Sequence, residues 1–139
     1  KWLFFISNTL HPALRMMFYP DKYVGADQAA QTALHAQLVK TLRVHLDTLE
    51  TLAAAKPSYF NSAAPTILDL YLCPLLRWMA LYPKNAPEWF DLTATPHLHA
   101  LATQMERRAS VNTAIIAEGL GPTPFSAPTY AQPPEGSPT

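Results

Sequence analysis

Residues 57–83 read PSYFNSAAPTILDLYLCPLLRWMALYP, and this stretch decides the fold class. Thr66 followed by Asp69 predicts a capping box, in which the threonine side chain caps a helix and the carboxylate accepts the threonine N–H. The box usually has Glu or Gln at its third position, so the aspartate is a variant. The residues that follow are apolar on every side of a helix, which predicts a buried central helix bent at Pro74.

Two helices are predicted before this stretch. Residues 2–18 are apolar over far more than one stripe, which is typical of a buried helix, and Pro12 predicts a kink within it. Residues 27–55 carry leucines every three or four positions with charged residues between them. This spacing predicts a long amphipathic helix that ends at Pro57.

Two shorter helices are predicted after it. Thr95 and Pro96 are typical of a helix start, and Ser110 predicts the cap of a last helix that ends at Gly119. No segment alternates as a strand does, so the sequence predicts an all-α fold of five or more helices. Residues 1–120 form the predicted helical domain. Residues 121–139 hold six of the fourteen prolines, which predicts an extended or disordered tail.

Composition narrows the class of protein. The 139 residues include ten basic and ten acidic side chains, and the only adjacent basic pair is Arg107–Arg108, which argues against nucleic acid or an anionic membrane as a partner. The single cysteine excludes an intrachain disulfide and favours a reducing compartment, so we expect a cytoplasmic protein. Because the chain begins with Lys1 rather than Met, we expect it to have been taken from something longer.

Several stretches resemble, in this order, the C-terminal domain of glutathione transferases. They are WLFFISNTLHPALRMMFYPD (2–21), the long helix at 27–55, YFNSAAPTILDLYLCPLLRWM (59–79), TPHLHALATQMERRASV (95–111) and AEGL (117–120). The resemblance covers about residues 1–120 and looks most like the bacterial beta class. It implies glutathione as co-substrate, a homodimer, and a preceding thioredoxin-like domain of about 80 residues that is not in this chain.

The resemblance also implies a residue near the glutathione sulfur. His11, in TLHP, stands where beta-class enzymes place a histidine that faces a cysteine of the N-terminal domain. The expected role is catalytic, because transfer requires the sulfur as thiolate. The family commonly has a lysine at the next position, where this chain has Pro12. That change removes a cation which could contact glutathione.

Four residues are predicted to line the electrophile pocket. Tyr71 and Trp78 match aromatic residues that the family places there, and their spacing of seven puts both on one face of a helix. Leu14 and Phe18 lie one and two turns beyond the histidine. Simple core packing is the alternative for all four.

Other reactive side chains fit structural roles better. Cys73 lies in LYLCPLL, which should bury the thiol and raise its pKa, so it is not expected to be a nucleophile. His97 and His99, and likewise His35 and His45, have spacings that place them on different helix faces. No metal site is therefore predicted.

The sequence thus predicts the C-terminal domain of a glutathione transferase that supplies the electrophile side of the site and is inactive alone. The parent enzyme would conjugate glutathione to apolar electrophiles or perform glutathione-linked thiol redox chemistry. A non-catalytic binding or assembly module of the same fold is the alternative, favoured by Pro12 and the tail. A free-standing helical bundle that binds apolar ligands is a third hypothesis.

Overall fold

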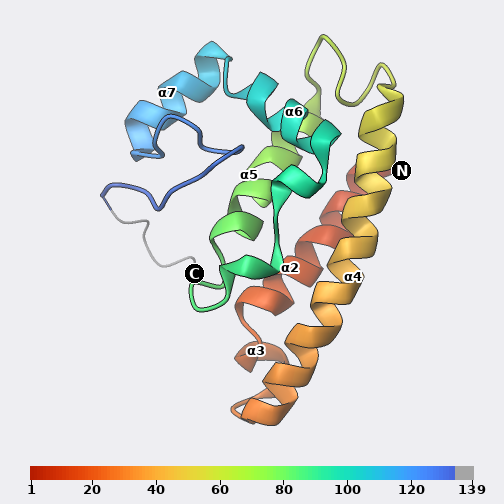
Figure 1. The fold of residues 1–139 in the computed structure, drawn as a ribbon, viewed down its shortest axis with the longest axis vertical. Coiled ribbons are helices and arrows are strands. Elements are labelled where there is room, and N and C mark those ends of the chain that lie inside the picture. Colours follow the sequence, from red (N-terminus) through yellow and green to blue (C-terminus); the bar gives the residue numbers. More distant parts are fainter. Residues whose placement is uncertain (134–139) are drawn as a thin grey trace.

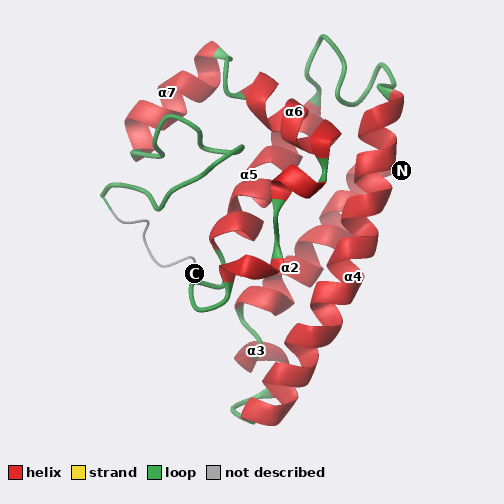
Figure 2. Ribbon diagram, viewed as in Figure 1, coloured by secondary structure: helices red, strands yellow, loops and turns green. Residues whose placement is uncertain are grey.

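The computed structural model describes residues 1–133, and these residues form helices and loops without a strand (Figures 1 and 2). The predicted all-α class is confirmed. Along the chain the elements are α1 (Trp2–Phe5), η1 (Ile6–Leu10), α2 (His11–Phe18), α3 (Asp21–Val24), α4 (Gln28–Ala55), α5 (Ile67–Leu81), η2 (Pro87–Trp89), η3 (Leu92–Ala94), α6 (Pro96–Met105) and α7 (Ala109–Glu118).

The predicted first helix is present as three consecutive pieces, α1, η1 and α2. The middle piece is a π-helical turn, in which the His11 N–H donates to the carbonyl of Ile6, five residues back. In an α-helix the ring of Pro12 would press on the carbonyl four residues before it, and proline has no N–H to donate. The wider π turn accommodates both effects, so helix α2 begins at His11 and continues through Pro12.

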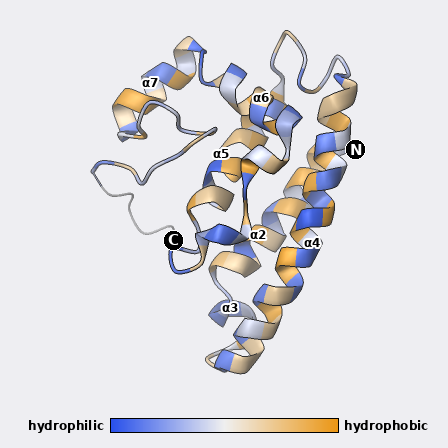
Figure 3. Ribbon diagram, viewed as in Figure 1, coloured by the Kyte–Doolittle hydropathy of each residue, from blue (hydrophilic) through white to orange (hydrophobic). Residues whose placement is uncertain are grey.

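Helix α4 runs along one side of the molecule and spans most of the molecule's long axis (Figure 1). Asp27 begins it by accepting the N–H groups of Ala29 and Ala30, and Lys56 ends it in the left-handed conformation before Pro57. Figure 3 shows the expected alternation of hydrophobic and hydrophilic residues along this helix. Its hydrophobic stripe packs against α2 and α6.

Helix α5 occupies the centre of the fold, as predicted from its apolar sequence (Figures 1 and 3). Thr66 and Asp69 form a capping box at its start, and the helix continues through Pro74 to Leu81. The Asp69 carboxylate is fully buried and accepts the N–H of Thr66 at 2.6 Å and that of Asn61 at 2.8 Å. The largest fully buried side chains among the described residues are Ile6, Leu10, Leu14, Met17, Leu42, Leu49, Phe60, Leu72, Leu75, Leu76, Met79 and Leu98.

The last two helices follow the prediction in part. Helix α6 begins at Pro96 after Thr95, as expected. Helix α7 begins at Ala109 rather than after Ser110, so the prediction that Ser110 caps this helix was wrong. Arg108 has the extended backbone that precedes a helix, and it places Ser110 inside the first turn. Gly119 ends α7 with φ of 62°, as predicted.

The predicted tail begins at residue 121, and its described part, residues 121–133, contains no helix or strand. Two charged side chains of the helical domain hold it. The buried Arg77 donates to the carbonyls of Pro124 and Thr129, and Glu106 accepts the N–H groups of Phe125 and Ser126. The rest of the predicted tail, 134–139, lies outside the described residues.

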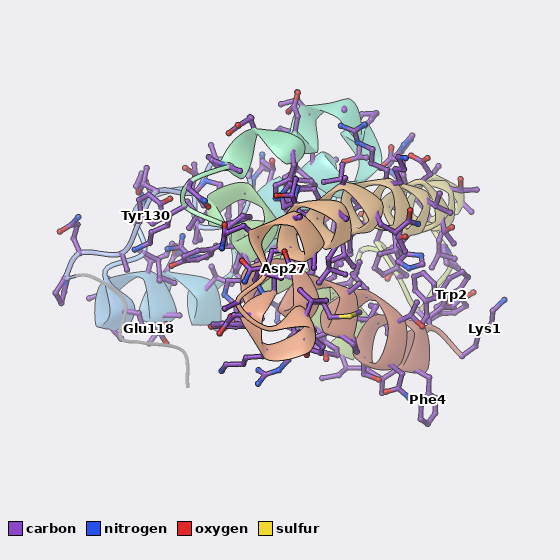
Figure 4. The ribbon with its side chains drawn as sticks, turned by 90° about the horizontal axis from the view of Figure 1, so that it is seen from below. Lys1, Trp2, Phe4, Asp27, Glu118 and Tyr130 are labelled. Carbon is purple, nitrogen blue, oxygen red and sulfur yellow. The ribbon has the colours of Figure 1, made fainter. Side chains whose placement is uncertain are left out.

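The N-terminal end of the molecule leaves large apolar side chains in solvent. Leu3 is 43% exposed and Phe4 is 69% exposed, and Phe4 projects away from the ribbon in Figure 4. The first helix, whose composition is typical of a buried helix, is therefore partly exposed at its N-terminal end. None of the helices formed by residues 1–133 has both the length and the hydrophobicity needed to cross a membrane.

Candidate functional site

Three residues predicted from the resemblance meet in space. The Nδ1 atom of His11, at the start of α2, lies 2.8 Å from the hydroxyl of Tyr71 on α5. The His11 ring stands edge to face with the Tyr71 ring at 5.9 Å and with the Trp78 ring at 5.7 Å. All three side chains are half-buried, so the cluster lies at the surface rather than in the core.

The surroundings of His11 keep its imidazole neutral. Burial is the main cause that lowers its pKa below the ordinary histidine value, and the positive charge of Arg15 lowers it further. At neutral pH the ring therefore carries one proton and has one nitrogen that can accept. Within residues 1–133, Nδ1 has Tyr71 as its partner and Nε2 makes no hydrogen bond. The second nitrogen is available to a ligand.

The other two predicted pocket residues, Leu14 and Phe18, differ in burial. Leu14 is fully buried and belongs to the core. Phe18 is half-buried, and its ring contacts Tyr82 at 5.9 Å. Tyr82 in turn contacts Tyr130 of the tail at 6.0 Å, so an aromatic row leads from α2 to the described part of the tail.

Two neighbours of the cluster were not singled out from the sequence. Arg15 lies one helical turn after His11 and is exposed. Tyr82 lies one turn after Trp78, at the end of α5. A search four residues beyond each predicted site residue would have found both, because positions four apart share one face of a helix.

The thiol of Cys73 is 1% exposed, and burial raises its pKa well above the ordinary value, with the charges of Asp69 and Glu106 adding to the effect. The predicted burial of this cysteine is confirmed. Within residues 1–133 no three His, Cys, Asp or Glu side chains are grouped so that they could hold a metal ion.

Two comparisons with known proteins give matches. The family described as "Glutathione S-transferase, C-terminal domain" matches residues 31–102, just over half of the chain. The chain is also similar to "Glutathione S-transferase GstA" of Escherichia coli O157:H7, with 28% identity over 120 residues. The alignment covers 86% of this chain and 52% of that protein, so the chain spans about half the length of this curated relative. The comparison with solved structures gives no significant match.

The family match includes the whole of α5, and therefore Tyr71 and Trp78. The all-helical fold agrees with the match, and the resemblance drawn from the sequence motifs is confirmed. The chain belongs to the glutathione S-transferase family, in which it is the helical C-terminal domain.

Proposed function

We propose that the protein carrying this domain transfers glutathione to apolar electrophiles, and that this domain supplies the electrophile side of the site. The observation that supports the proposal is the half-buried cluster of His11, Tyr71 and Trp78, in which one histidine ring nitrogen makes no hydrogen bond with the described part of the chain. Aromatic faces bind flat apolar molecules well, and a ring nitrogen beside them can act on the attacking sulfur.

In the proposed step, the glutathione sulfur attacks an electrophilic carbon as a thiolate. A new carbon–sulfur bond forms, the bond to a leaving group such as chloride breaks, and the leaving group departs with its electron pair. A free thiol has a pKa of about 8.5, so the site has to favour the thiolate. A hydrogen bond from the neutral His11 ring to the sulfur stabilises the anion without placing a second positive charge beside Arg15.

The proposal divides the work between two domains. The glutathione cradle and the residue that first activates the sulfur belong to a thioredoxin-like domain, so we expect residues 1–139 alone to be inactive. The exposed Leu3 and Phe4 support a further covering partner, either that domain or the second subunit of a homodimer. Glutathione-linked thiol exchange is the other chemistry that the same arrangement can serve. A reducing compartment, the cytoplasm, suits both.

The experiment is a His11→Ala substitution in the full-length protein, assayed with glutathione and an activated chloronitrobenzene. We expect kcat/KM to fall about 100-fold, in the range of other positioned acid–base groups. His99→Ala is the matched control, since His99 is also half-buried but lies on α6. It should leave kcat/KM within a factor of two or so of the wild type.

A different result would favour the second function. If His11→Ala keeps its transferase activity but changes the oligomeric state or the binding of a protein partner, the domain is a binding or assembly module. Pro12, which stands where the family commonly has lysine, is the feature that favours this reading. Turnover of the electrophile by isolated residues 1–139 would overturn the division of work between domains.

A further inference from the structure

The imidazole of His11 is held by three features of the fold. Tyr71 and Trp78 are seven residues apart on α5, which separates them by about 10 Å along the helix axis. The His11 ring fits between them, 5.9 Å from one ring centre and 5.7 Å from the other. The π turn before His11 sets where this side chain leaves the backbone. Each contact is edge to face, the arrangement that aromatic rings prefer.

Unlike Trp78, Tyr71 makes a hydrogen bond to the His11 ring. Its hydroxyl lies 2.8 Å from Nδ1 of His11, which is the only hydrogen bond that this hydroxyl makes within residues 1–133. A phenol can donate or accept, and a neutral imidazole has one nitrogen of each kind. The direction of this one hydrogen bond therefore decides which ring nitrogen carries the proton.

We propose that Tyr71 is a positioning residue: its hydroxyl donates to Nδ1 of His11, and so places the imidazole proton on Nε2. The Nε2–H group then faces away from the pair as a donor, ready for a sulfur anion. This inference rests on the proposed function, because the sulfur is what gives the donor its task. It also changes the role predicted for Tyr71, from contact with the electrophile to control of His11.

Donation by the hydroxyl is the direction that satisfies more groups. If Nδ1 carried the proton and donated to Tyr71, the phenol proton would have no acceptor among residues 1–133, and Nε2 would be a bare acceptor. With the hydroxyl donating, the phenol proton and Nδ1 are both satisfied within the domain. Only one donor is left over, and it is at the nitrogen that is free to meet a ligand.

The direct test is nitrogen NMR of the imidazole of His11 in the full-length protein at neutral pH. A ring nitrogen that carries a proton resonates at a clearly lower frequency than one that does not. We expect the protonated type of signal at Nε2 and the unprotonated type at Nδ1. In Tyr71→Phe, which keeps the ring contacts and removes only the hydroxyl, we expect the two signals to move towards each other as the tautomers mix. A proton on Nδ1 in the wild type would overturn the inference.

Kinetics give an independent readout. Tyr71→Phe should lower kcat/KM for glutathione transfer about 10-fold, as is common for partners that orient a functional histidine. Tyr59→Phe is the matched control, because Tyr59 is an exposed tyrosine in the loop before α5, and it should leave the rate unchanged. An unchanged rate in Tyr71→Phe, combined with a large loss in His11→Ala, would overturn this inference and leave the proposed function standing. Full activity in His11→Ala would overturn both this inference and the role proposed for His11 at the sulfur.

Discussion

The polar side chains on the two sides of helix α5 differ in burial and in hydrogen bonding. On its buried side, Asp69 and Arg77 are 0% and 4% exposed, and both make hydrogen bonds to backbone groups of this same chain. On its open side, Tyr71 and Trp78 are half-buried, and they contact a histidine that has one nitrogen without a hydrogen-bond partner among residues 1–133. The buried hydrogen bonds hold loops in place, whereas the histidine nitrogen on the open side can still form a hydrogen bond to a ligand.

The difference teaches how to separate structural polar residues from functional ones in this fold. We call a buried charged residue that makes hydrogen bonds to backbone groups a brace, and its removal should change stability. A half-buried polar group with unused capacity contributes little to stability, and its removal should change activity instead. The substitutions below test this division, beginning with the largest expected loss of stability.

Asp69→Ala should be the most damaging change on the buried side. It leaves the N–H groups of Thr66 and Asn61 without their carboxylate partner in a region closed to water. We expect the free energy of unfolding to fall by about 3–5 kcal/mol, measured by urea unfolding. Asp47→Ala, at an exposed position of α4, is the control. Equal effects of the two variants would contradict the role of Asp69 as a brace.

Arg77→Met should release the described part of the tail. The variant keeps an apolar stem of similar length but removes the donors to the carbonyls of Pro124 and Thr129. We expect a loss of about 2–3 kcal/mol and faster cleavage by a protease within residues 121–133. Arg43→Met, an exposed arginine of α4, should change neither quantity. A tail that stays protected in Arg77→Met would show that Glu106 and local packing suffice to hold it.

Glu50→Gln should show a dependence on pH. Burial alone would raise the pKa of Glu50, but the N–H groups of His97 and Leu98 and the His97 ring together lower it below the ordinary value of 4.5. The carboxylate therefore stabilises the fold above the pKa of the unfolded chain. This contribution is lost as the pH falls through the folded pKa.

We expect Glu50→Gln to be about 1–2 kcal/mol less stable than the wild type at neutral pH, as for the loss of a helix cap. The gap should close as the pH is lowered through and below 4.5, the ordinary value for this carboxyl. Urea unfolding across this range measures it, with the exposed Glu118→Gln as control. A gap that widens on acidification would contradict the assigned direction of the pKa shift.

Tyr71→Phe should be the mildest change in stability. It removes one half-buried hydrogen bond and keeps the ring, so we expect a loss of about 1 kcal/mol or less by urea unfolding. By contrast, kcat/KM should fall about 10-fold, as expected for a residue that acts in the site rather than in the stability of the fold. If the free energy of unfolding fell as much as in Asp69→Ala, Tyr71 would have a structural role like that of Asp69.

The same division explains what could be predicted from the sequence. The Thr66–Asp69 cap was predicted because its two residues are three positions apart, and the long helices because their apolar spacing is local. The contacts of Arg77 with the tail and of Glu50 with His97 span more than forty residues, and no local pattern encodes them. A charged residue within an apolar helix was the only signal for Arg77.

Three of the five predicted site residues, His11, Tyr71 and Trp78, meet in the structure, but their geometry could not be predicted. His11 and Tyr71 are 60 residues apart, and only the family resemblance placed both near one site. The hydrogen bond between them, and the π turn that precedes His11 and Pro12, depend on packing that residue spacing does not reveal. Leu14, one helical turn from His11, is fully buried because that face of α2 forms part of the core.

The most direct test of the central claim is the titration of bound glutathione, followed by the ultraviolet absorbance of its thiolate, in the full-length wild type and in His11→Ala. If the Nε2–H of His11 stabilises the sulfur anion, the midpoint of the thiolate signal should rise by about one pH unit in the variant, as expected for the loss of one hydrogen bond to a charged group. The same midpoint in both proteins would contradict a role for His11 at the sulfur.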